Sequence, residues 1–407
     1  MTNYDFLYNK EYYGSLLTAE HRVDRDLRWS VIPNGTVLPH QDLNGSIGGG
    51  LLNERGEFII GSGLHRGLDF GYKIAGEAVA EREEDVVFLG LWPDVWGHCL
   101  TDNIRRLWVL RSEEFMNRYG HLRFLYLPMY NRPLGQNFRK LLEILGAGEV
   151  RLEPVNQITR FRTIILPDEC FCTKDDGTRL FTREYQALID RIRDYGEAHF
   201  EPMDDRKLYF TYRNYSAMRT IGERKLEQYF SKMGYRIVSP EQYTFAEQLN
   251  MLLNCVAFAS TIGSASHNII FLRDGTNAHL IPRMWFIPEY QLALDQVHDL
   301  NITYVDSSLS LCAAPNSPWN GPFYYIISRQ LQECFGHSCR SRAHSIDFGV
   351  YRDLSRAMNG EVRPAEYYCH AWREYMAADP QQTSKETLLV KLCRNYRVRK
   401  LIAGLLG

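Results

Sequence analysis

The sequence lacks several features that mark specialised classes of protein. It contains no run of about 18 apolar residues, so we expect no membrane-spanning helix. Its N-terminus carries no basic stretch followed by an apolar core, so it does not resemble a secretory signal. Its 47 basic and 49 acidic residues leave a net charge of −2, which excludes a surface built throughout for nucleic acid.

The sequence also lacks a recognisable metal-binding or disulfide pattern. Its nine cysteines are odd in number and scattered, and without an export signal we expect reduced thiols in a cytoplasmic protein. Cys334, His337, Cys339 and His344 lie close together, but their spacing fits no common zinc pattern. The sequence therefore predicts no metal site.

The length of 407 residues exceeds what one ordinary hydrophobic core requires, and two domains are the natural expectation. A polar joint that contains Pro202 spans residues 201–205 and marks a boundary. We therefore expect an N-terminal α/β domain at 1–200, a second domain at 201–310 and a C-terminal extension at 311–407.

The first half alternates strands and helices after a less regular start. Residues 1–85 combine dense glycine with short apolar runs, which indicates short strands and turns. Beyond them, apolar runs and helical spacing predict strands at 85–92, 124–130, 150–154 and 161–166, and helices at 97–111, 135–146 and 181–199.

The second half alternates more regularly. The same patterns predict strands at 207–212, 235–239, 256–260, 278–282 and 302–306, and helices at 222–233, 244–254, 265–273 and 322–332. Strands that alternate with helices at this spacing form βαβ units and a parallel sheet. The sequence therefore predicts an α/β fold.

The C-terminal extension carries a basic helical pattern at 385–404, where Lys391, Arg394 and Arg397 alternate with apolar residues. Two interpretations stay open. The segment is either a helix docked on the protein with solvated charges, or a basic amphipathic helix that contacts an anionic membrane surface.

A first group of residues suited to chemistry lies in the segment WGHCLTDNIRRLW at 96–108. On a helix, His98, Asp102 and Arg105 fall on one side, with Arg106 at its edge, directly after a buried strand. A histidine and an aspartate four residues apart can act as an acid–base pair. The alternative is structural, with a capping His98 and an Asp102–Arg106 ion pair.

A second group lies in the segment TIGSASHN at 261–268, which follows a predicted strand and opens a predicted helix. Its small residues would let a ligand approach the backbone, and free N–H groups at the helix start would suit a diphosphate: Gly263, Ser264, Ala265 and Ser266. The alternative is a loop that uses small residues only to turn.

Two arginines follow the first strand of the second half. Arg213 lies just past that strand, and Arg219 lies six residues further on. Arginines beside a phosphate-binding loop could neutralise a diphosphate leaving group. Otherwise they are ordinary surface arginines.

Four motifs, in order over residues 86–285, resemble glycosyltransferase family 61. They are GHCLTDNIRRLW, KLYFTYR with a following Arg and Glu, MGYRIVSPEQYTFAEQ, and ASTIGSASHNIIFLRDGTNAHLIPR. The positions that match the family pattern are Gly97, His98, Asp102, Arg106, Arg213, Arg219, Glu223, Pro240, Glu241, Glu247, Gln248, Gly263 and Asn268. Three positions depart from it: Gly222 replaces Asn, Ile262 replaces His, and Ala265 replaces Gly.

The resemblance implies a GT-B-like arrangement, in which two Rossmann-like domains face a cleft. It implies an inverting transferase that uses no metal and no other cofactor and takes a nucleotide-sugar, UDP-linked by expectation, as its donor. The donor would bind the second domain and a glycan acceptor the first. Asp102 or His98 would be the base, and the diphosphate would be held by Arg213, Arg219 and the loop. By analogy, the acceptors belong to capsular or other surface polysaccharide made at the inner membrane face.

Two other functions stay open at this point. One is a different Rossmann-type enzyme, such as a nicotinamide-dependent oxidoreductase, although the sequence lacks GxGxxG between a strand and a helix. The other is a non-catalytic carbohydrate-binding or assembly protein on a transferase fold, which the departures at Ile262 and Ala265 favour.

Overall fold

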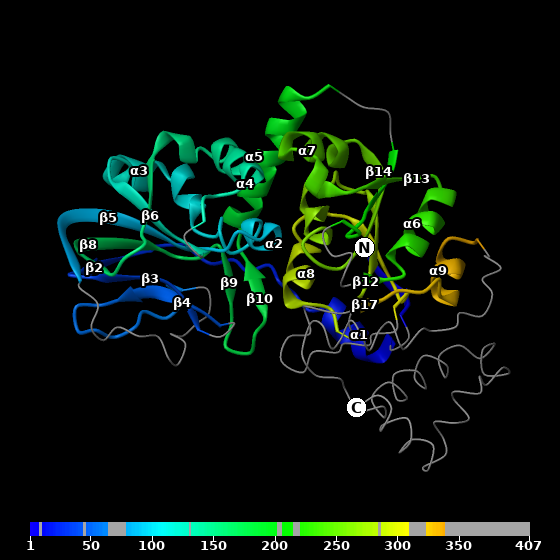
Figure 1. Cartoon of the computed structure of the whole chain (residues 1–407), viewed down its shortest axis with the longest axis horizontal. Helices are drawn as coiled ribbons and strands as arrows, with labels where there is room; N and C mark the ends of the chain where they lie inside the picture. Colours follow the sequence, from blue (N-terminus) through cyan, green and yellow to red (C-terminus); the bar gives the residue numbers. More distant parts are fainter. Residues whose placement is uncertain are drawn as a thin grey trace, which may run out of the picture.

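The computed structural model describes residues 1–7, 10–43, 46–63, 79–129, 132–201, 206–214, 220–283, 286–308 and 323–337 (Figure 1). Within these ranges the chain forms two larger sheets, two short two-stranded sheets and several helices. The predicted α/β class is confirmed. Arg219 and the segment 385–404 lie outside the described residues.

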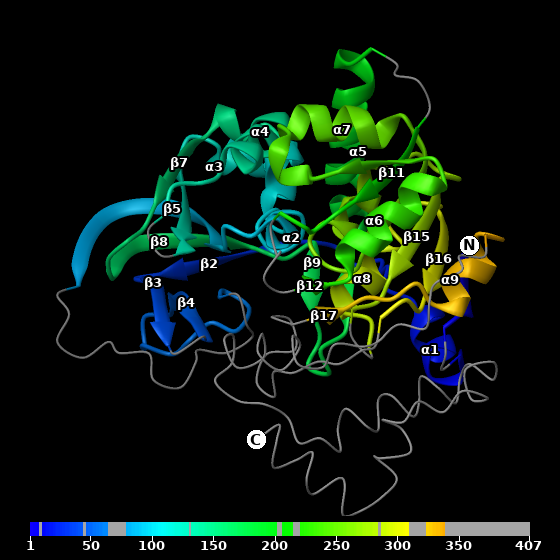
Figure 2. The same ribbon diagram turned by 45° about the vertical axis from the view of Figure 1, so that its right-hand side comes forward.

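One larger sheet contains six described strands, and each neighbouring pair in it is parallel. Its order is β13 (Tyr235–Val238), β11 (Arg206–Phe210), β14 (Cys255–Thr261), β15 (Asn277–Ile281), β16 (Asn301–Val305) and β1 (Thr2–Phe6). Five of these strands confirm the predicted parallel sheet. The sixth, β1, comes from the N-terminal segment, which lies beside β16 in blue (Figure 2).

Helices cover the six-stranded sheet through the apolar faces expected from sequence. They are α6 (Glu223–Lys232), α7 (Phe245–Leu253), the 3₁₀ helix η5 (Ser266–Phe271) and α8 (Glu289–Leu294). Leu226 and Phe230 of α6 are fully buried. Helix α7 begins at a capping box, in which Thr244 accepts from the Glu247 amide while Glu247 accepts from the Thr244 amide.

The other larger sheet has seven described strands and is mixed. The strands β8 (Thr159–Pro167), β5 (Ala80–Trp92), β6 (Arg123–Pro128) and β7 (Arg151–Pro154) run parallel in that order. The strands β2 (Trp29–Pro33), β3 (Thr36–Leu43) and β4 (Ser46–Leu52) pair antiparallel.

The remaining elements connect and cover these sheets. They are α1 (Lys10–Leu17), α2 (Trp96–Cys99), η1 (Leu107–Arg111), α3 (Glu113–Tyr119), α4 (Gln136–Ile144), η3 (Ala147–Glu149), β9 (Phe171–Thr173), β10 (Arg179–Phe181), α5 (Arg183–His199), β12 (Thr220–Ile221), η4 (Pro240–Gln242), β17 (Phe323–Tyr324) and α9 (Arg329–Cys334). No helix within the described ranges combines the length and apolar content that a membrane crossing needs.

Three predicted helices are wrong in extent or type. In place of the helix predicted at 97–111, the chain forms the short helix α2, then turns, then η1. The helix does not continue because its polar side chains are buried against other segments instead of facing solvent on one side. The helix at 265–273 is the short 3₁₀ helix η5. The helix at 322–332 is a strand, β17, followed by the later helix α9.

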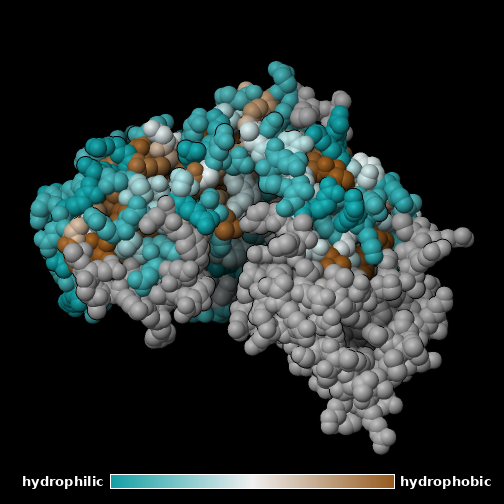
Figure 3. Space-filling model, in the orientation of Figure 1, coloured by the Kyte–Doolittle hydropathy of each residue, from teal (hydrophilic) through white to brown (hydrophobic). Residues whose placement is uncertain are grey.

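The two larger sheets share one hydrophobic core. Residues of both belong to a single buried cluster, and α5 packs against α7. The packing at Gly196 is so close that a Cβ there would lie 2.4 Å from Leu253 Cδ1. At the surface the described residues are mostly hydrophilic, and the molecule is hollowed where its two halves meet (Figure 3).

Candidate functional site

His98 and Asp102 form a hydrogen-bonded pair just beyond the carboxyl end of β5. His98 lies on α2, and Asp102 lies in the turn that follows it. His98 Nδ1 and Asp102 Oδ2 are 2.6 Å apart. The His98 side chain is 30% exposed while that of Asp102 is 0% exposed, so only the imidazole reaches the surface.

The Asp102 carboxylate is buried among donors and cations. Tyr290 OH donates to its two oxygens at 3.1 and 2.9 Å, and Thr101 Oγ1 lies 3.2 Å from Oδ2. Arg105 and Arg179 each place a guanidinium nitrogen within 3.7 Å of Oδ1. Burial alone would raise the pKa of Asp102, but the His98 hydrogen bond and these positive charges hold it well below its usual range.

Tyr290 and Arg179 complete this arrangement from distant parts of the sequence. Tyr290 belongs to α8, and Arg179 belongs to β10, with its guanidinium 3.9 Å from the Tyr290 ring centre. Burial, together with the Asp102 charge, raises the pKa of Tyr290 well above its usual value, so the hydroxyl stays protonated and keeps donating. Neither residue was predicted from the sequence, because no local pattern connects them to Asp102.

The loop at 263–268 lies directly against α2. Trp96 Nε1 donates to Asn268 Oδ1 at 3.0 Å. A Cβ on Gly97 would lie 3.0 Å from both Ser264 Oγ and His267 Nδ1, so glycine lets the two segments touch. The structure therefore brings the two predicted groups of residues together.

The loop is held by its own hydrogen bonds, which changes one expectation. Ser266 Oγ accepts from the Gly263 amide at 3.0 Å, and Tyr212 OH accepts from the Ala265 amide at 2.5 Å. The Ser266 amide itself donates to Gly263 O at 2.9 Å. The expected row of free N–H groups at a helix start is therefore wrong, because these amides already have acceptors. Gly263 and Ser264 remain partly exposed.

His267 is a further residue that the sequence analysis missed, although it lies inside the segment singled out at 261–268. It is 91% buried, and its Nδ1 has no hydrogen-bond partner within the described structure. Burial and the nearby charge of His98 lower the pKa of His267 to about 4, so this imidazole is neutral at pH 7. Its ring lies 6.3 Å from that of Tyr290.

Of the two arginines predicted to bind the diphosphate, Arg213 lies within the described residues. It follows β11, the central neighbour of β14, and its side chain is 46% exposed. Its Nη1 lies 3.2 Å from Glu227 Oε2. Because β13, β11 and β14 lie side by side in that order, the loops after β11 and β14 flank the point where the sheet reverses its winding, where α/β sheets bind ligands.

Three other predicted site residues are placed differently. The Arg106 guanidinium is buried and bonds to Glu169 Oε1 at 2.8 Å and to Pro167 O at 2.9 Å. Gln248 Nε2 donates to Pro240 O at 2.8 Å within the protein. Glu241 is exposed on η4. The arrangement of the His98 pair and the loop includes none of these side chains.

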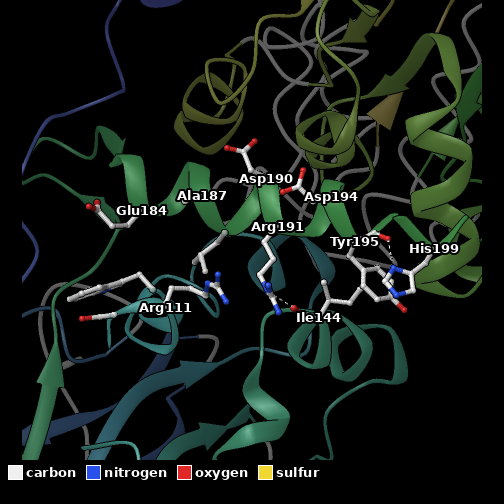
Figure 4. Close-up of a pocket in the computed structure, with 12 residues that line it drawn as sticks. Arg111, Ile144, Glu184, Ala187, Asp190, Arg191, Asp194, Tyr195 and His199 are labelled. Atoms are coloured by element: carbon white, nitrogen blue, oxygen red, sulfur yellow. Dashed lines mark hydrogen bonds between the residues drawn. The ribbon is translucent and has the colours of Figure 1, made fainter. Parts of the chain in front are cut away.

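A separate groove of about 710 Å³ lies along α5, away from all of these residues. Its lining mixes charged and aromatic side chains, including Trp108, Asp190 and Tyr195, and Arg191 donates to Ile144 O at its edge (Figure 4). No cluster of three histidine, cysteine, aspartate or glutamate side chains suited to a metal occurs among the described residues.

Comparison with known proteins gives one family match. Residues 96–279 match the family model described as glycosyltransferase 61, a segment that contains His98, Asp102, Arg213 and the 263–268 loop. A search of curated proteins found no match to the chain. The resemblance noted in the sequence is therefore confirmed over residues 96–279, and glycosyltransferase family 61 implies glycosyltransferase activity.

Proposed function

We propose that the protein is an inverting glycosyltransferase that moves a sugar from a nucleotide-sugar, by preference a UDP-sugar, to a hydroxyl of a glycan. The observation that carries this proposal is the contact between helix α2, which carries His98 of the His98–Asp102 pair, and the 263–268 loop. An acid–base pair and a ligand-binding edge of a parallel sheet thus meet at one place.

His98 is the base in this proposal, and Asp102 is its positioning residue. Asp102 is fully buried and already accepts from Tyr290 and His98, so it does not reach an acceptor hydroxyl. By holding Nδ1, the carboxylate leaves Nε2 of the exposed imidazole to take the proton. The negative charge of Asp102 then stabilises the positive charge that forms on the ring.

In this proposal the sugar is transferred by direct displacement, without a metal ion. The acceptor oxygen attacks the anomeric carbon from the face opposite the diphosphate and forms the new C–O bond. The old C–O bond breaks, and its electron pair leaves with the nucleoside diphosphate. The hydroxyl proton passes to His98 Nε2. Positive groups beside the loop, Arg213 among those described, stabilise the departing charge.

The wider layout follows from this assignment. In a GT-B-like arrangement the donor occupies the domain at 201–310, the acceptor occupies the domain at 1–200, and 311–407 is an extension. Cytoplasmic placement with surface or capsular polysaccharide acceptors, and membrane contact through 385–404, complete the proposal. The basis for the membrane contact is the sequence, because 385–404 lies outside the described residues. Arg219, the second arginine proposed for the diphosphate, lies outside them as well.

Binding and turnover test the proposal separately. We expect UDP or another nucleoside diphosphate, with its sugar conjugates, to bind in EDTA by isothermal titration. We also expect slow hydrolysis of that nucleotide-sugar without an acceptor, which His98→Ala abolishes while donor binding stays. Binding of NAD in place of every nucleoside diphosphate would contradict the proposal. Donor binding without hydrolysis or transfer would instead favour the non-catalytic carbohydrate-binding alternative.

A further inference from the structure

Arg283 lies at the same edge of the six-stranded sheet as Arg213 and the 263–268 loop. It follows β15 by two residues, and β15 is the neighbour of β14, which leads into the loop. It also lies four residues beyond the segment that matches the family model, which ends at 279. Arg283 ends the last of the four motifs, yet it is not among the positions matched to the family pattern or predicted for the site.

Two aromatic rings hold the Arg283 guanidinium. Its carbon lies 4.9 Å from the Tyr212 ring centre and 4.7 Å from that of Phe323. It also lies on the backbone of the loop, because a Cβ added at Gly263 would be 2.0 Å from Arg283 Nη2. Gly263 is thus required for this contact, and the guanidinium is fixed before any ligand arrives.

The charge of Arg283 has no counterion among the described residues. The other cations near the site have one, since Arg213 pairs with Glu227, and Arg105 and Arg106 both pair with Glu169. Within the same ranges, no carboxylate approaches Arg283 to ion-pair distance, and its buried Nε has no hydrogen-bond partner. Keeping a partly buried cation and a buried donor unpaired costs free energy that an anionic ligand would recover.

We propose that Arg283 binds the diphosphate of the donor, an inference that rests on the proposed function. The loop amides at Gly263, Ala265 and Ser266 are already occupied, so the loop alone offers few donors to a phosphate. Arg283 supplies them as a planar fork that matches phosphate oxygens. When the bond from the anomeric carbon breaks, its electron pair moves to the diphosphate, and Arg283 stabilises that charge.

The test measures binding of UDP and of inorganic pyrophosphate to the full chain by isothermal titration in EDTA. We expect Arg283→Gln to weaken both by roughly 10- to 100-fold, as loss of a charged hydrogen bond predicts. Arg283→Lys, which keeps the charge without the fork, should fall between. The matched control is Arg273→Gln, because Arg273 pairs with Glu197 at 3.3 Å and is 52% exposed.

The outcomes separate this inference from the proposed function. Wild-type binding that Arg283→Gln changes by less than twofold would overturn the role of Arg283 and leave the transferase proposal standing. A wild type that binds no nucleoside diphosphate would overturn the proposed function. In that case pyrophosphate binding still tests the role of Arg283. If the wild type binds pyrophosphate and only Arg283→Gln loses this binding, Arg283 is part of an anion site. If the wild type binds no pyrophosphate, the anion site is refuted. Unliganded melting curves of each variant check that the fold is kept.

Discussion

Asp102 has hydrogen-bond and ion-pair partners from three separate segments, and this makes its substitution informative at the scale of one residue. In Asp102→Asn the side chain keeps its size but loses its negative charge. That charge orients His98 and stabilises the positive charge that forms on the His98 ring. We expect kcat to fall by roughly 10²- to 10⁴-fold, the usual contribution of acid–base catalysis. The donor dissociation constant, measured by titration, should stay within about twofold.

A surface carboxylate provides the control for that substitution. Asp85→Asn removes an ion pair with Arg162 at 2.8 Å that is far from α2 in the fold, and we expect it to leave kcat unchanged. If both Asp102→Asn and Asp85→Asn keep the wild-type kcat, Asp102 does not act as a positioning residue for His98.

Asp295 predicts a pH dependence of stability. Burial raises its pKa from 3.8 to about 7, although Gln291 and Tyr304 donate hydrogen bonds to it. Between about pH 4 and pH 7 the unfolded chain ionises Asp295 while the folded protein keeps it protonated. The free energy of unfolding therefore falls as pH rises through this window, by on the order of 4 kcal/mol from this group.

The comparison with Asp295→Asn isolates that effect. The side chain of the variant cannot ionise, so the variant lacks this loss of stability. Its unfolding free energy minus that of the wild type should therefore increase from pH 4 to pH 7. Urea unfolding at a series of pH values measures it. A difference that stays constant across the window would show that Asp295 is ionised in the folded protein.

The sequence placed some residues of the candidate site together and missed others, for a physical reason. The spacing of His98 and Asp102 is local, so a single turn and its continuation bring them together. Tyr290, Arg179 and Arg283 come from other elements, and only the packing of the fold places them. Arg106 is local too, yet its ion pair with Glu169 could not be foreseen from spacing.

At the scale of elements, α6 lies between two glycines, Gly222 and Gly234, whose surroundings differ. Gly222 and Gly234 have φ values of +91° and +82°. A Cβ at Gly222 would lie 2.1 Å from the Tyr325 carbonyl oxygen, while nothing lies within 4 Å of one at Gly234. We expect Gly234→Ala to cost about 1–2 kcal/mol for the backbone conformation. Gly222→Ala should cost about 1–3 kcal/mol more because of the overlap.

Chemical denaturation of both glycine variants measures this difference. Equal costs would mean that Tyr325, which directly follows β17, moves freely away from α6. The pair also bears on function, since Gly222 stands where the family pattern has asparagine.

The type and extent of elements with one solvent-exposed face and one buried face could be predicted from the sequence. Those of elements buried on several sides could not. The apolar stripe of α6 and the capping box of α7 define helices from local sequence alone. The segment after α2 has helical spacing too, but Asp102, Asn103 and Arg105 are all at most 2% exposed. Their partners lie in other segments, so tertiary hydrogen bonds replace the helix there.

At the scale of the whole molecule, β1 ties the N-terminus to the six-stranded sheet. The Ile302 amide donates to Met1 O at 3.0 Å and the Asp306 amide donates to Phe6 O at 3.0 Å. Deletion of residues 1–6 should lower the melting temperature and speed hydrogen exchange at these two amides. The Ile262 amide, which donates to Ile281 O at 2.8 Å on the inner side of the sheet, is the internal reference.

Exchange at Ile302 and Asp306 that stays as slow as in the full chain would contradict this role of β1. The sequence predicted the five strands of the second half because each alternates with a helix. It could not predict β1, since nothing in a five-residue strand specifies a partner about 300 residues away. The antiparallel pairing of the other sheet could not be predicted either, because strands such as β2 and the glycine-rich β4 are short and specify their register weakly.

The pairing of β1 with β16 also orders events during synthesis of the chain. The strands of the seven-stranded sheet, which end at Pro167, leave the ribosome before any partner of β1 exists. At about 5–20 residues per second, β1 waits roughly 15–60 seconds for β16. During that time its edge is open to other chains, so a nascent-chain chaperone that shields extended segments would be needed most in this interval.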